Sequence, residues 1–307
     1  MTIGRFAPSP SGSLHLGNLR TALVAWCCAR SAGGQFLIRM EDLTTGAAPV
    51  AEAEQLDDLR VLGIDHDGPV TRQSERAEKH RQVLAELEQM GVTYPCFCSR
   101  REIREATLAP HGPDPTGLYP GTCAKLTEGQ RRDRLRSVGR AATRIRAHSA
   151  VVAFDDRLNG TTTATVDDFV LCRADGIVAY NLAVVVDDAA AGVDQVVRGD
   201  DLLGTTHRQV YLQGLLGLPT PEYVHVPLVL GPDGDRLSKR HGAVGLREQL
   251  DRGADVEQVL ALLAHSLDPL CFDPGGRTTI AEVLANFDVD SLPREPWLLD
   301  PHLLSWG

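Results

Sequence analysis

The first forty residues constrain the fold most strongly. Residues 3–7 have the pattern of a short strand, residues 8–12 form a turn rich in Pro, Ser and Gly, and an apolar helical stretch continues to about residue 30. A second strand is expected at residues 35–40, and helices are expected at 49–62 and 75–90. Strands that alternate with helices in this way predict a parallel sheet with helices packed against it.

The pattern changes between residues 93 and 150, where cysteine, proline, glycine and arginine interrupt the regular periodicity. We interpret this segment as an insertion that divides one domain into two halves, residues 1–92 and 151–242. Strands at 169–173, 195–198 and 224–230 and helices at 180–190 and 202–216 are expected to complete the sheet. Only helical patterns remain in the C-terminal region, residues 243–307.

The composition predicts an ordinary soluble protein, with 43% hydrophobic and 23% charged residues. No apolar run approaches the roughly 20 residues that span a bilayer, and the start of the chain lacks a basic segment followed by an apolar one. The seven cysteines are an odd number, which argues against a secreted disulfide framework. We therefore expect a cytoplasmic protein with reduced thiols and no membrane partner, and a monomer is compatible with these features.

The formal net charge of -10 argues against indiscriminate binding to nucleic acid, because such binding needs cations that neutralise phosphates. An RNA partner would have to contact a local basic patch. Residues 131–146 offer one, although a solvated helix face is an equally good interpretation. The basic side chains of this segment are Arg131, Arg132, Arg134, Arg136, Arg140, Arg144 and Arg146.

Two segments have the composition of a nucleotide site. His15 and Gly17 lie where the first loop opens into a helix, and the amino end of a helix attracts anions. The second segment, Arg236-Leu237-Ser238-Lys239-Arg240, follows a Gly-Pro-Asp-Gly turn and carries three cations, which suit the charge that develops on a reacting phosphate. Alone, the first is most often a structural histidine and the second a solvated loop. Together, at opposite ends of one α/β unit, they favour a nucleotide site.

These two segments resemble the signature motifs of the class I aminoacyl-tRNA synthetases of the glutamyl type. His15-Leu16-Gly17-Asn18 resembles the adenylate-binding motif, with Asn18 where histidine is commonest, and residues 236–240 resemble the lysine-serine-lysine motif, with Arg236 in place of lysine. The resemblance implies that His15, Gly17, Asn18 and Lys239 bind ATP, which Mg²⁺ accompanies. His15 and Lys239 would stabilise the transition state.

The same resemblance implies a glutamate site. Glutamate presents one ammonium and two carboxylates, so a selective pocket needs a carboxylate and forked cationic donors. Five residues occupy the matching positions of the family's motifs: Arg5, Ser9, Glu41, Tyr180 and Arg198. We expect Glu41 to bind the substrate ammonium, Arg5 and Arg198 to bind the carboxylates, and Tyr180 and Ser9 to fix the orientation. Outside this context, each charged residue would be interpreted as part of an ordinary ion pair.

Cysteines in the insertion predict a metal site. Cys96 and Cys98 are followed after a gap by Tyr119 and Cys123, and zinc accepts thiolates in a closed tetrahedral site that can stabilise a segment with little apolar core. The spacing alone also allows three cysteines with water, or no metal. The arrangement resembles the zinc element of the glutamyl-queuosine tRNA(Asp) synthetases, which implies structural zinc bound by all four residues. The remaining cysteines, Cys27, Cys28, Cys172 and Cys271, are expected to be inert core thiols.

The resemblance as a whole implies an α/β fold: a Rossmann-like parallel-sheet catalytic domain with a zinc-binding insertion and a short helical C-terminal region. About 65 residues follow the lysine loop, so we expect no anticodon-binding part. The implied activity is ATP-dependent activation of L-glutamate to glutamyl-adenylate without tRNA, and then transfer to the queuosine base of tRNA(Asp). Residues 43–47, Leu-Thr-Thr-Gly-Ala, depart from the family's usual aspartate and nearby arginine, which puts one substrate or tRNA contact in doubt.

Three alternatives remain open on the sequence alone. A truncated glutamyl-tRNA synthetase would charge a tRNA terminus, and an amino-acid ligase would use the same adenylate with another acceptor. A catalytically inactive RNA-binding paralogue would keep the scaffold without the chemistry. The presence of Arg5, Glu41, Tyr180, Arg198 and Lys239 together argues against the third alternative.

Overall fold

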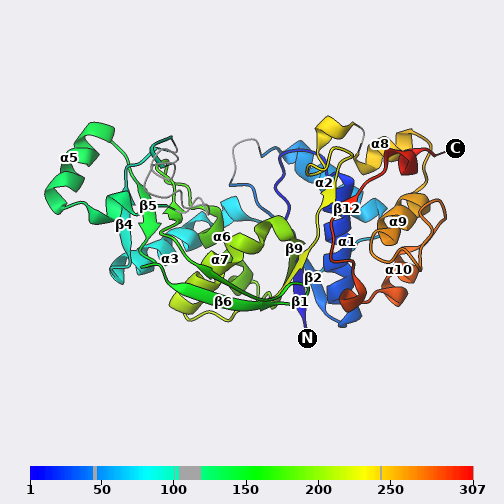
Figure 1. The fold of residues 1–307 in the computed structure, drawn as a ribbon, viewed down its shortest axis with the longest axis horizontal. Coiled ribbons are helices and arrows are strands. Elements are labelled where there is room, and N and C mark those ends of the chain that lie inside the picture. The colour runs from blue at the N-terminus through cyan, green and yellow to red at the C-terminus, as the bar shows by residue number, and fades with distance from the viewer. Residues whose placement is uncertain (44–46, 100, 104–118, 243, 307) are drawn as a thin grey trace.

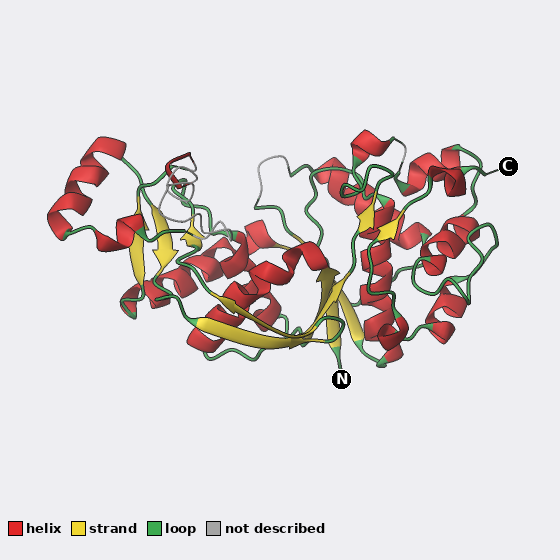
Figure 2. Cartoon of the chain, viewed as in Figure 1, coloured by secondary structure: helices red, strands yellow, loops and turns green. Residues whose placement is uncertain are grey.

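The computed structural model describes residues 1–307 except 44–46, 100, 104–118, 243 and 307. The molecule is elongated, with helix α5 (Glu128–Val138) near one end and helices α9 (Val256–His265) and α10 (Ile280–Asn286) near the other (Figure 1). A central sheet lies between these ends, with helices on both sides of its strands (Figure 2). The α/β fold class is therefore confirmed.

The central sheet has seven strands in the order β3-β2-β1-β9-β10-β6-β7. Neighbours from β3 to β6 pair in parallel, and only β7, which forms a hairpin with β6, is antiparallel. The predicted parallel sheet is confirmed. The bounds are β1 Ile3–Phe6, β2 Gln35–Met40, β3 Thr71–Arg72, β6 Val151–Asp156, β7 Gly160–Thr165, β9 Gln195–Gly199 and β10 Glu222–Val226.

The crossover helices leave the middle of this sheet in opposite directions. Helix α1 (Leu16–Ser31) connects β1 to β2, whereas α7 (Leu203–Leu215) connects β9 to β10 on the other side. The strand order reverses between the parallel neighbours β1 and β9, because β1 is followed outward by β2 and β9 is followed outward, on the other side, by β10. Ligands of open α/β sheets bind at such a point. The other helices here are α2 Pro49–Val61, α3 Ala77–Gln89, α6 Tyr180–Ala190 and α8 Leu246–Asp251.

Helix α1 is buried on nearly all sides, from Leu16 to Ala29, because it packs between the sheet and the C-terminal helices. Arg20, 1% exposed, joins it to the C-terminal region: its guanidinium donates to the Pro227 carbonyl at 2.8 Å and to the Ser266 hydroxyl at 2.9 Å. The C-terminal region thus supports the helix that borders the candidate site. Within the described residues, no helix is both long and apolar enough to cross a membrane.

A second, antiparallel sheet has three strands: β4 (Thr93–Cys96) and β5 (Ala142–Ile145), from the expected insertion, and β8 (Val170–Cys172), which follows it in the sequence. The strand expected at residues 169–173 is present as β8, but the prediction that it helps complete the parallel sheet was wrong. Periodicity identifies a strand without identifying its partner, and β8 pairs with β5 across a β-bulge. The hairpin β6–β7 extends the large sheet instead.

Two predictions near the C-terminus also need correction. The strand expected at 224–230 is two strands, β10 and β11 (Val229–Leu230), separated by Pro227, which has no backbone N–H to donate to a ladder. Residues after 242 are not only helical, because β12 (Trp297–Leu298) pairs in parallel with β11. Strands of two residues are too short to produce a recognisable period.

Candidate active site

A cavity of about 570 Å³ lies at the carboxyl ends of β1 and β9, where the strand order of the sheet reverses. It is lined by the loop after β1, the start of α1, the end of β2 and the start of α6. This cavity brings together eight residues that the sequence singled out. They are Arg5, Ser9, His15, Gly17, Asn18, Glu41, Tyr180 and Arg198.

His15 caps the helix that points at the cavity. The backbone N–H of Asn18 donates to His15 Nδ1 at 3.2 Å, and the backbone N–H of His15 donates to Asn18 Oδ1 at 3.3 Å, which completes a capping box. Burial, and then the charge of Arg236, lowers the pKa of His15 to about 4. The imidazole is therefore neutral near pH 7. Since Nδ1 accepts, its proton lies on Nε2, which remains a donor.

Gly17 is required for close packing at this helix start. A Cβ added to Gly17 would lie 3.1 Å from the His15 ring and 3.2 Å from Cβ of Val229. Both distances are tighter than most real contacts, so a larger residue would displace the imidazole. Gly17 therefore makes room for the imidazole at the start of the helix.

The loop after β1 is held by a residue that the sequence reasoning missed. Gln55, on α2 and 1% exposed, donates from Nε2 to the carbonyl of Ser9 at 3.1 Å and to the carbonyl of Gly12 at 2.6 Å. The backbone N–H of Glu41 also donates to the carbonyl of Pro8 at 2.9 Å. These bonds fix the loop against the end of β2 and the middle of α2. No local pattern marks Gln55, because its partners lie more than forty residues away.

A buried carboxylate, Asp188 on α6, joins the first two strands below the cavity. It pairs with Arg5 on β1, at 3.3 Å from Nε, and with Arg39 on β2. Burial alone would raise the pKa of Asp188, but the charges of Arg39 and Arg5 outweigh it and hold the pKa below its usual value. Asp188 is therefore ionised and largely neutralised by these two arginines.

Glu41 differs from Asp188 in its charge balance. Its carboxylate lies 3.4 Å from NH2 of Arg39, which Asp188 also engages. Burial raises the pKa of Glu41, although the charges of Arg39 and Arg5 oppose that effect. A partly buried carboxylate that lines a cavity and shares its one cation with another carboxylate can accept a cationic group from a ligand.

Arg198, on β9, is the complementary group. It is 5% exposed, and its NH1 donates to the Tyr180 hydroxyl at 3.5 Å. Arg5 and Arg236, the other arginines that line the cavity, each pair with an aspartate. Among the described residues, no carboxylate forms an ion pair with Arg198. The cavity thus presents a buried cation, Arg198, and a partly buried anion, Glu41, whose charge is only partly compensated. Together they match an amino acid that carries a second carboxylate.

The lysine loop borders the same cavity through Arg236, whose NH1 lies 2.5 Å from Asp201. Arg240 points to its own loop, where it pairs with Asp233 at 3.6 Å and with Asp235. The backbone of Lys239 begins a short 3-10 turn, Lys239–His241. The Lys239 side chain lies outside the described part of the chain, so its phosphate contact stays a prediction.

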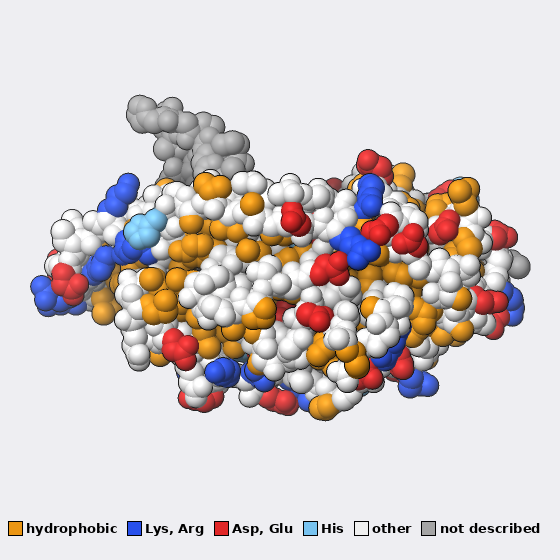
Figure 3. Space-filling view, turned by 90° about the horizontal axis from the view of Figure 1, so that it is seen from below, with side chains coloured by type: hydrophobic (Ala, Val, Ile, Leu, Met, Phe, Trp, Pro, Cys, Tyr) orange, Lys and Arg blue, Asp and Glu red, His pale blue; other side chains and the backbone are white. Residues whose placement is uncertain are grey.

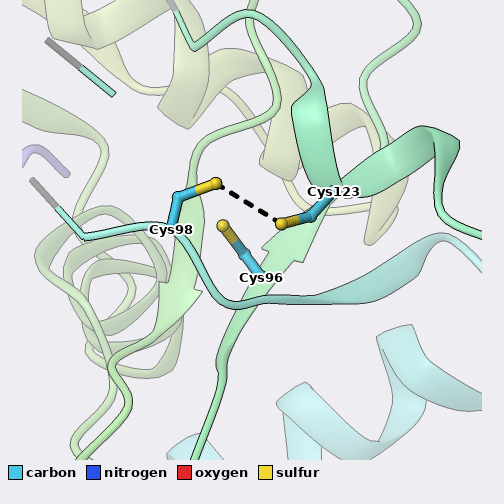
Figure 4. A group of neighbouring side chains, drawn as sticks. All are labelled: Cys96, Cys98 and Cys123. Carbon is cyan, nitrogen blue, oxygen red and sulfur yellow. Dashed lines mark hydrogen bonds between the residues drawn. The ribbon is translucent and has the colours of Figure 1, made fainter. Parts of the chain in front are cut away.

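Four donor atoms converge in the insertion. The sulfurs of Cys96, Cys98 and Cys123 all lie within 4.8 Å of one another, with 3.4 Å between Cys98 and Cys123 (Figure 4). The Tyr119 hydroxyl lies 3.4 Å from Sγ of Cys96 and 3.5 Å from Sγ of Cys98. Ideal tetrahedral zinc would separate two sulfurs by about 3.8 Å and a sulfur from an oxygen by about 3.5 Å.

The donors therefore have the chemistry and nearly the spacing of a closed tetrahedral metal site. The residues also come from two separate segments, so an ion would join them. Cys96 ends β4 and Cys98 follows it, whereas Cys123 lies in the turn η2 (Thr122–Lys125) and Tyr119 precedes that turn. Burial is the largest cause that raises the pKa of Cys98, to about 12. A metal would have to displace that proton, as thiolate binding requires.

The remaining cysteines were predicted to be core thiols. Cys27, Cys28 and Cys172 are buried, and burial raises the pKa of each thiol, which keeps it protonated. The prediction is wrong for Cys271, which is exposed. It lies in a turn after α9, and its sequence neighbourhood did not reveal that exposure.

The basic segment 131–146 divides into two parts. Arg132, Arg134, Arg136 and Arg140 are exposed on or after α5, which buries none of its residues, and Lys and Arg side chains gather at this end of the molecule (Figure 3). Arg144 instead is 6% exposed and stacks 3.8 Å from the centre of the Tyr119 ring. Arg146 stacks 4.7 Å from the centre of the Tyr94 ring. The basic surface is therefore smaller than predicted.

Comparison with known families and proteins gives a consistent result. The family model described as tRNA synthetases class I (E and Q), catalytic domain, matches residues 2–305. A protein of Nocardia farcinica named glutamyl-Q tRNA(Asp) synthetase is 56% identical over 297 residues, which is 96% of this chain and 92% of that protein. A protein of the same name from Symbiobacterium thermophilum is 46% identical over 310 residues, which is 96% of this chain and 95% of that protein.

Solved structures show the same fold. The crystal structure of a glutamate tRNA ligase from Elizabethkingia meningosepticum in complex with its amino acid superposes with a TM-score of 0.82. The match covers 99% of this chain and 68% of that chain, at 24% sequence identity. At that identity the likeness concerns the fold.

The Asp188 cluster leads to a stability prediction. Asp188→Asn keeps the shape of the side chain but leaves Arg5 and Arg39 buried with little compensation, so we expect a loss of about 3–5 kcal/mol in the free energy of unfolding. The pKa of Asp188 is lowered in the folded protein, so its contribution is present above the unfolded pKa of about 3.9 and is lost as the pH falls through the folded value. The advantage of the wild type should therefore shrink below about pH 4.

Urea denaturation at several pH values measures both effects. Asp175→Asn is the matched control, because the ion pair between Asp175 and Arg173 is about 40% exposed on both sides and should contribute little. Equal stability of Asp188→Asn and the wild type at pH 7 would contradict the role given to Asp188.

Proposed function

The chain belongs to the class I tRNA synthetases of the glutamate and glutamine type, and from this premise we propose that it is a ligase that activates L-glutamate with ATP. The glutamyl group then passes to the queuosine base of tRNA(Asp). The observation that carries the proposal is the cavity itself, where a buried cation, a partly buried anion and a capped helix start surround one space.

In the first step, an oxygen of the glutamate α-carboxylate attacks the α-phosphorus of ATP. A bond forms between this oxygen and phosphorus, the bond to the bridging oxygen breaks, and pyrophosphate leaves. The acceptor then attacks the carbonyl carbon of the adenylate, and AMP leaves. The first step needs positioning and charge stabilisation rather than a protein nucleophile or base.

Glutamate recognition follows from the charges of the cavity. We assign the substrate ammonium to Glu41 and the side-chain carboxylate to Arg198, with Arg5 as a second donor. Arg198 supports this assignment because its described contacts are neutral, whereas Arg5 already engages Asp188. Tyr180 and Ser9, which also line the cavity, would supply the hydrogen bonds that orient the substrate.

The phosphate end of ATP would lie at the start of α1. His15 can donate from Nε2 without adding a full charge, and Gly17 and Asn18 line the same wall. We assign Lys239 to the phosphates, with Arg236 beside it. Asp201, a lining carboxylate that also pairs with Arg236, would help to hold the Mg²⁺ that accompanies ATP, and the ion would neutralise phosphate charge.

The proposed acceptor rests on the relatives' names, because both proteins compared above are named for glutamyl-Q and tRNA(Asp). The exposed arginines of α5 and the segment after it suit an RNA backbone, in a chain that is otherwise acidic. The fold shared with a glutamate tRNA ligase favours a second candidate, transfer to a tRNA terminus. Both candidates use the same glutamyl-adenylate.

We also propose that the sulfur cluster holds one structural zinc ion. Cys96, Cys98, Cys123 and Tyr119 would bind it, and zinc supplies the insertion with cross-links that its small apolar core lacks. A zinc-supported insertion at residues 93–150, between the two halves of the catalytic domain, is part of this proposal. A cytoplasmic monomer is also part of it, in keeping with seven free cysteines.

The activation step is tested by ATP–pyrophosphate exchange without tRNA. We expect exchange with glutamate but not with aspartate or glutamine. The fixed separation of Glu41 and Arg198 suits one side-chain length, and Arg198 favours a carboxylate over the neutral amide of glutamine. Lys239→Ala should lower the rate by roughly 10²–10³-fold, the usual cost of losing one transition-state donor. Lys79→Ala, which removes an exposed lysine on α3, is the matched control and should leave the rate unchanged. No exchange by the wild type, even with tRNA present, would overturn the proposal.

The metal is tested by elemental analysis of the purified protein. We expect one zinc per chain in the wild type, near loss of zinc in Cys123→Ser, and a lower thermal unfolding midpoint after chelation. Cys271→Ser is the control, because its exposed thiol lies outside the cluster. Unmetallated protein from zinc-supplemented cultures, or equal zinc in Cys123→Ser and Cys271→Ser, would refute the assignment.

A further inference from the structure

The contacts of Arg198 are unusual for a buried arginine. Its Nε donates to Nε2 of His225 at 3.1 Å, and its NH2 donates to the Thr206 hydroxyl at 2.6 Å. With the long contact from NH1 to Tyr180, these partners are all neutral. The Nε and NH2 edge of the guanidinium is thus occupied by the protein, which leaves N–H groups of NH1 and NH2 for a ligand.

The protonation of His225 follows from its partners. An arginine can only donate, so Nε2 of His225 accepts and the ring proton lies on Nδ1. Nδ1 donates to Oδ2 of Asp156 at 2.6 Å, and both side chains are fully buried. Burial lowers the pKa of His225, although Asp156 opposes this effect. The imidazole is therefore neutral and turns an acceptor toward Arg198.

Asp156 is itself held by the β6–β7 turn. Its Oδ1 accepts from the backbone N–H of Leu158 at 3.1 Å, and from the backbone and side-chain N–H of Asn159 at 3.0 and 2.7 Å. Tyr223 adds a second constraint, because its ring stacks on His225 at 5.8 Å and lies 5.4 Å from the Arg198 guanidinium. Neither Asp156 nor His225 lines the cavity.

The order Asp156, His225, Thr206 is that of a hydrolytic triad, but the geometry excludes a nucleophile. Thr206 is fully buried, and no substrate atom can reach its oxygen. Its hydroxyl lies 2.9 Å from the Leu202 carbonyl and 2.9 Å from Nε2 of His225, and can donate its proton to either. In both cases the hydroxyl oxygen accepts a hydrogen bond from NH2 of Arg198. These atoms are acceptors arranged around a guanidinium.

We propose that Asp156, His225 and Thr206 are positioning residues that hold Arg198 in one orientation, without a carboxylate partner among the described residues. The N–H groups of Arg198 that remain free then select the carboxylate of the substrate. The inference rests on the proposed glutamate activation and extends it to residues outside the cavity. An uncompensated, oriented guanidinium favours a carboxylate over a neutral amide, because charge-assisted bonds are stronger than neutral ones. A carboxylate in place of Thr206 or His225 would neutralise Arg198 and remove that preference.

The test compares Thr206→Val, which keeps the side-chain shape but removes the acceptor, with the conservative rescue Thr206→Ser. We expect Thr206→Val to raise the KM for glutamate in pyrophosphate exchange by about tenfold or more, the effect of one hydrogen bond to a charged group. The KM for ATP should stay within about twofold, and Thr206→Ser should restore the KM for glutamate. Asp156→Asn should show the same split between the two substrates.

Two further measurements keep the outcomes distinct. His80→Asn removes another buried histidine that pairs with an aspartate, Asp187, and it controls for general loss of stability. Thermal unfolding shows whether each variant folds. If Thr206→Val does not fold, the KM values of Asp156→Asn test the proposal instead. An unchanged KM for glutamate in a folded Thr206→Val, or equal changes in His80→Asn, would overturn the positioning role while leaving the activation intact. Absence of exchange in the wild type would contradict both the positioning role and the proposed glutamate activation.

Discussion

The ion cluster of Asp188 with Arg5 and Arg39 is the interaction on which the site depends. One buried carboxylate on α6 joins β1 to β2. Because unpaired charges are costly inside a protein, this arrangement fixes α6 against the two strands whose ends border the cavity. Tyr180, at the start of the same helix, is positioned as a consequence.

The cluster also divides the charges of the site unequally. Asp188 largely neutralises Arg5 and Arg39, so Glu41 shares Arg39 with a second carboxylate. The described contacts of Arg198 are all to neutral acceptors. An amino acid with a second carboxylate supplies the missing partner of each group. Selectivity for glutamate then arises from the charges of Arg198 and Glu41, which the protein leaves uncompensated or only partly compensated. The neutral His15 at the start of α1 adds a hydrogen-bond donor for phosphate and, without a charge, does not compete with Arg198 for the carboxylate.

The sequence predicted the parallel sheet and the residues of the cavity because both depend on local patterns: alternation of strands and helices, and short motifs at strand ends. It could not predict Asp188, Gln55 or the contacts of His225, since each has partners distant along the chain and buried polar pairs have no period. The predictions of the partner of β8 and of an exposed Arg144 were wrong for the same reason. A period identifies a strand or a charged segment, whereas its partner is decided by packing.

The most direct test of this account is a crystal structure with a hydrolysis-resistant glutamyl-adenylate analogue. The account predicts that the analogue lies in the cavity between β1 and β9, with its side-chain carboxylate on Arg198, its ammonium on Glu41, and Arg5 still paired with Asp188. An analogue that leaves Arg198 without a carboxylate partner, or that binds outside this cavity, would contradict it.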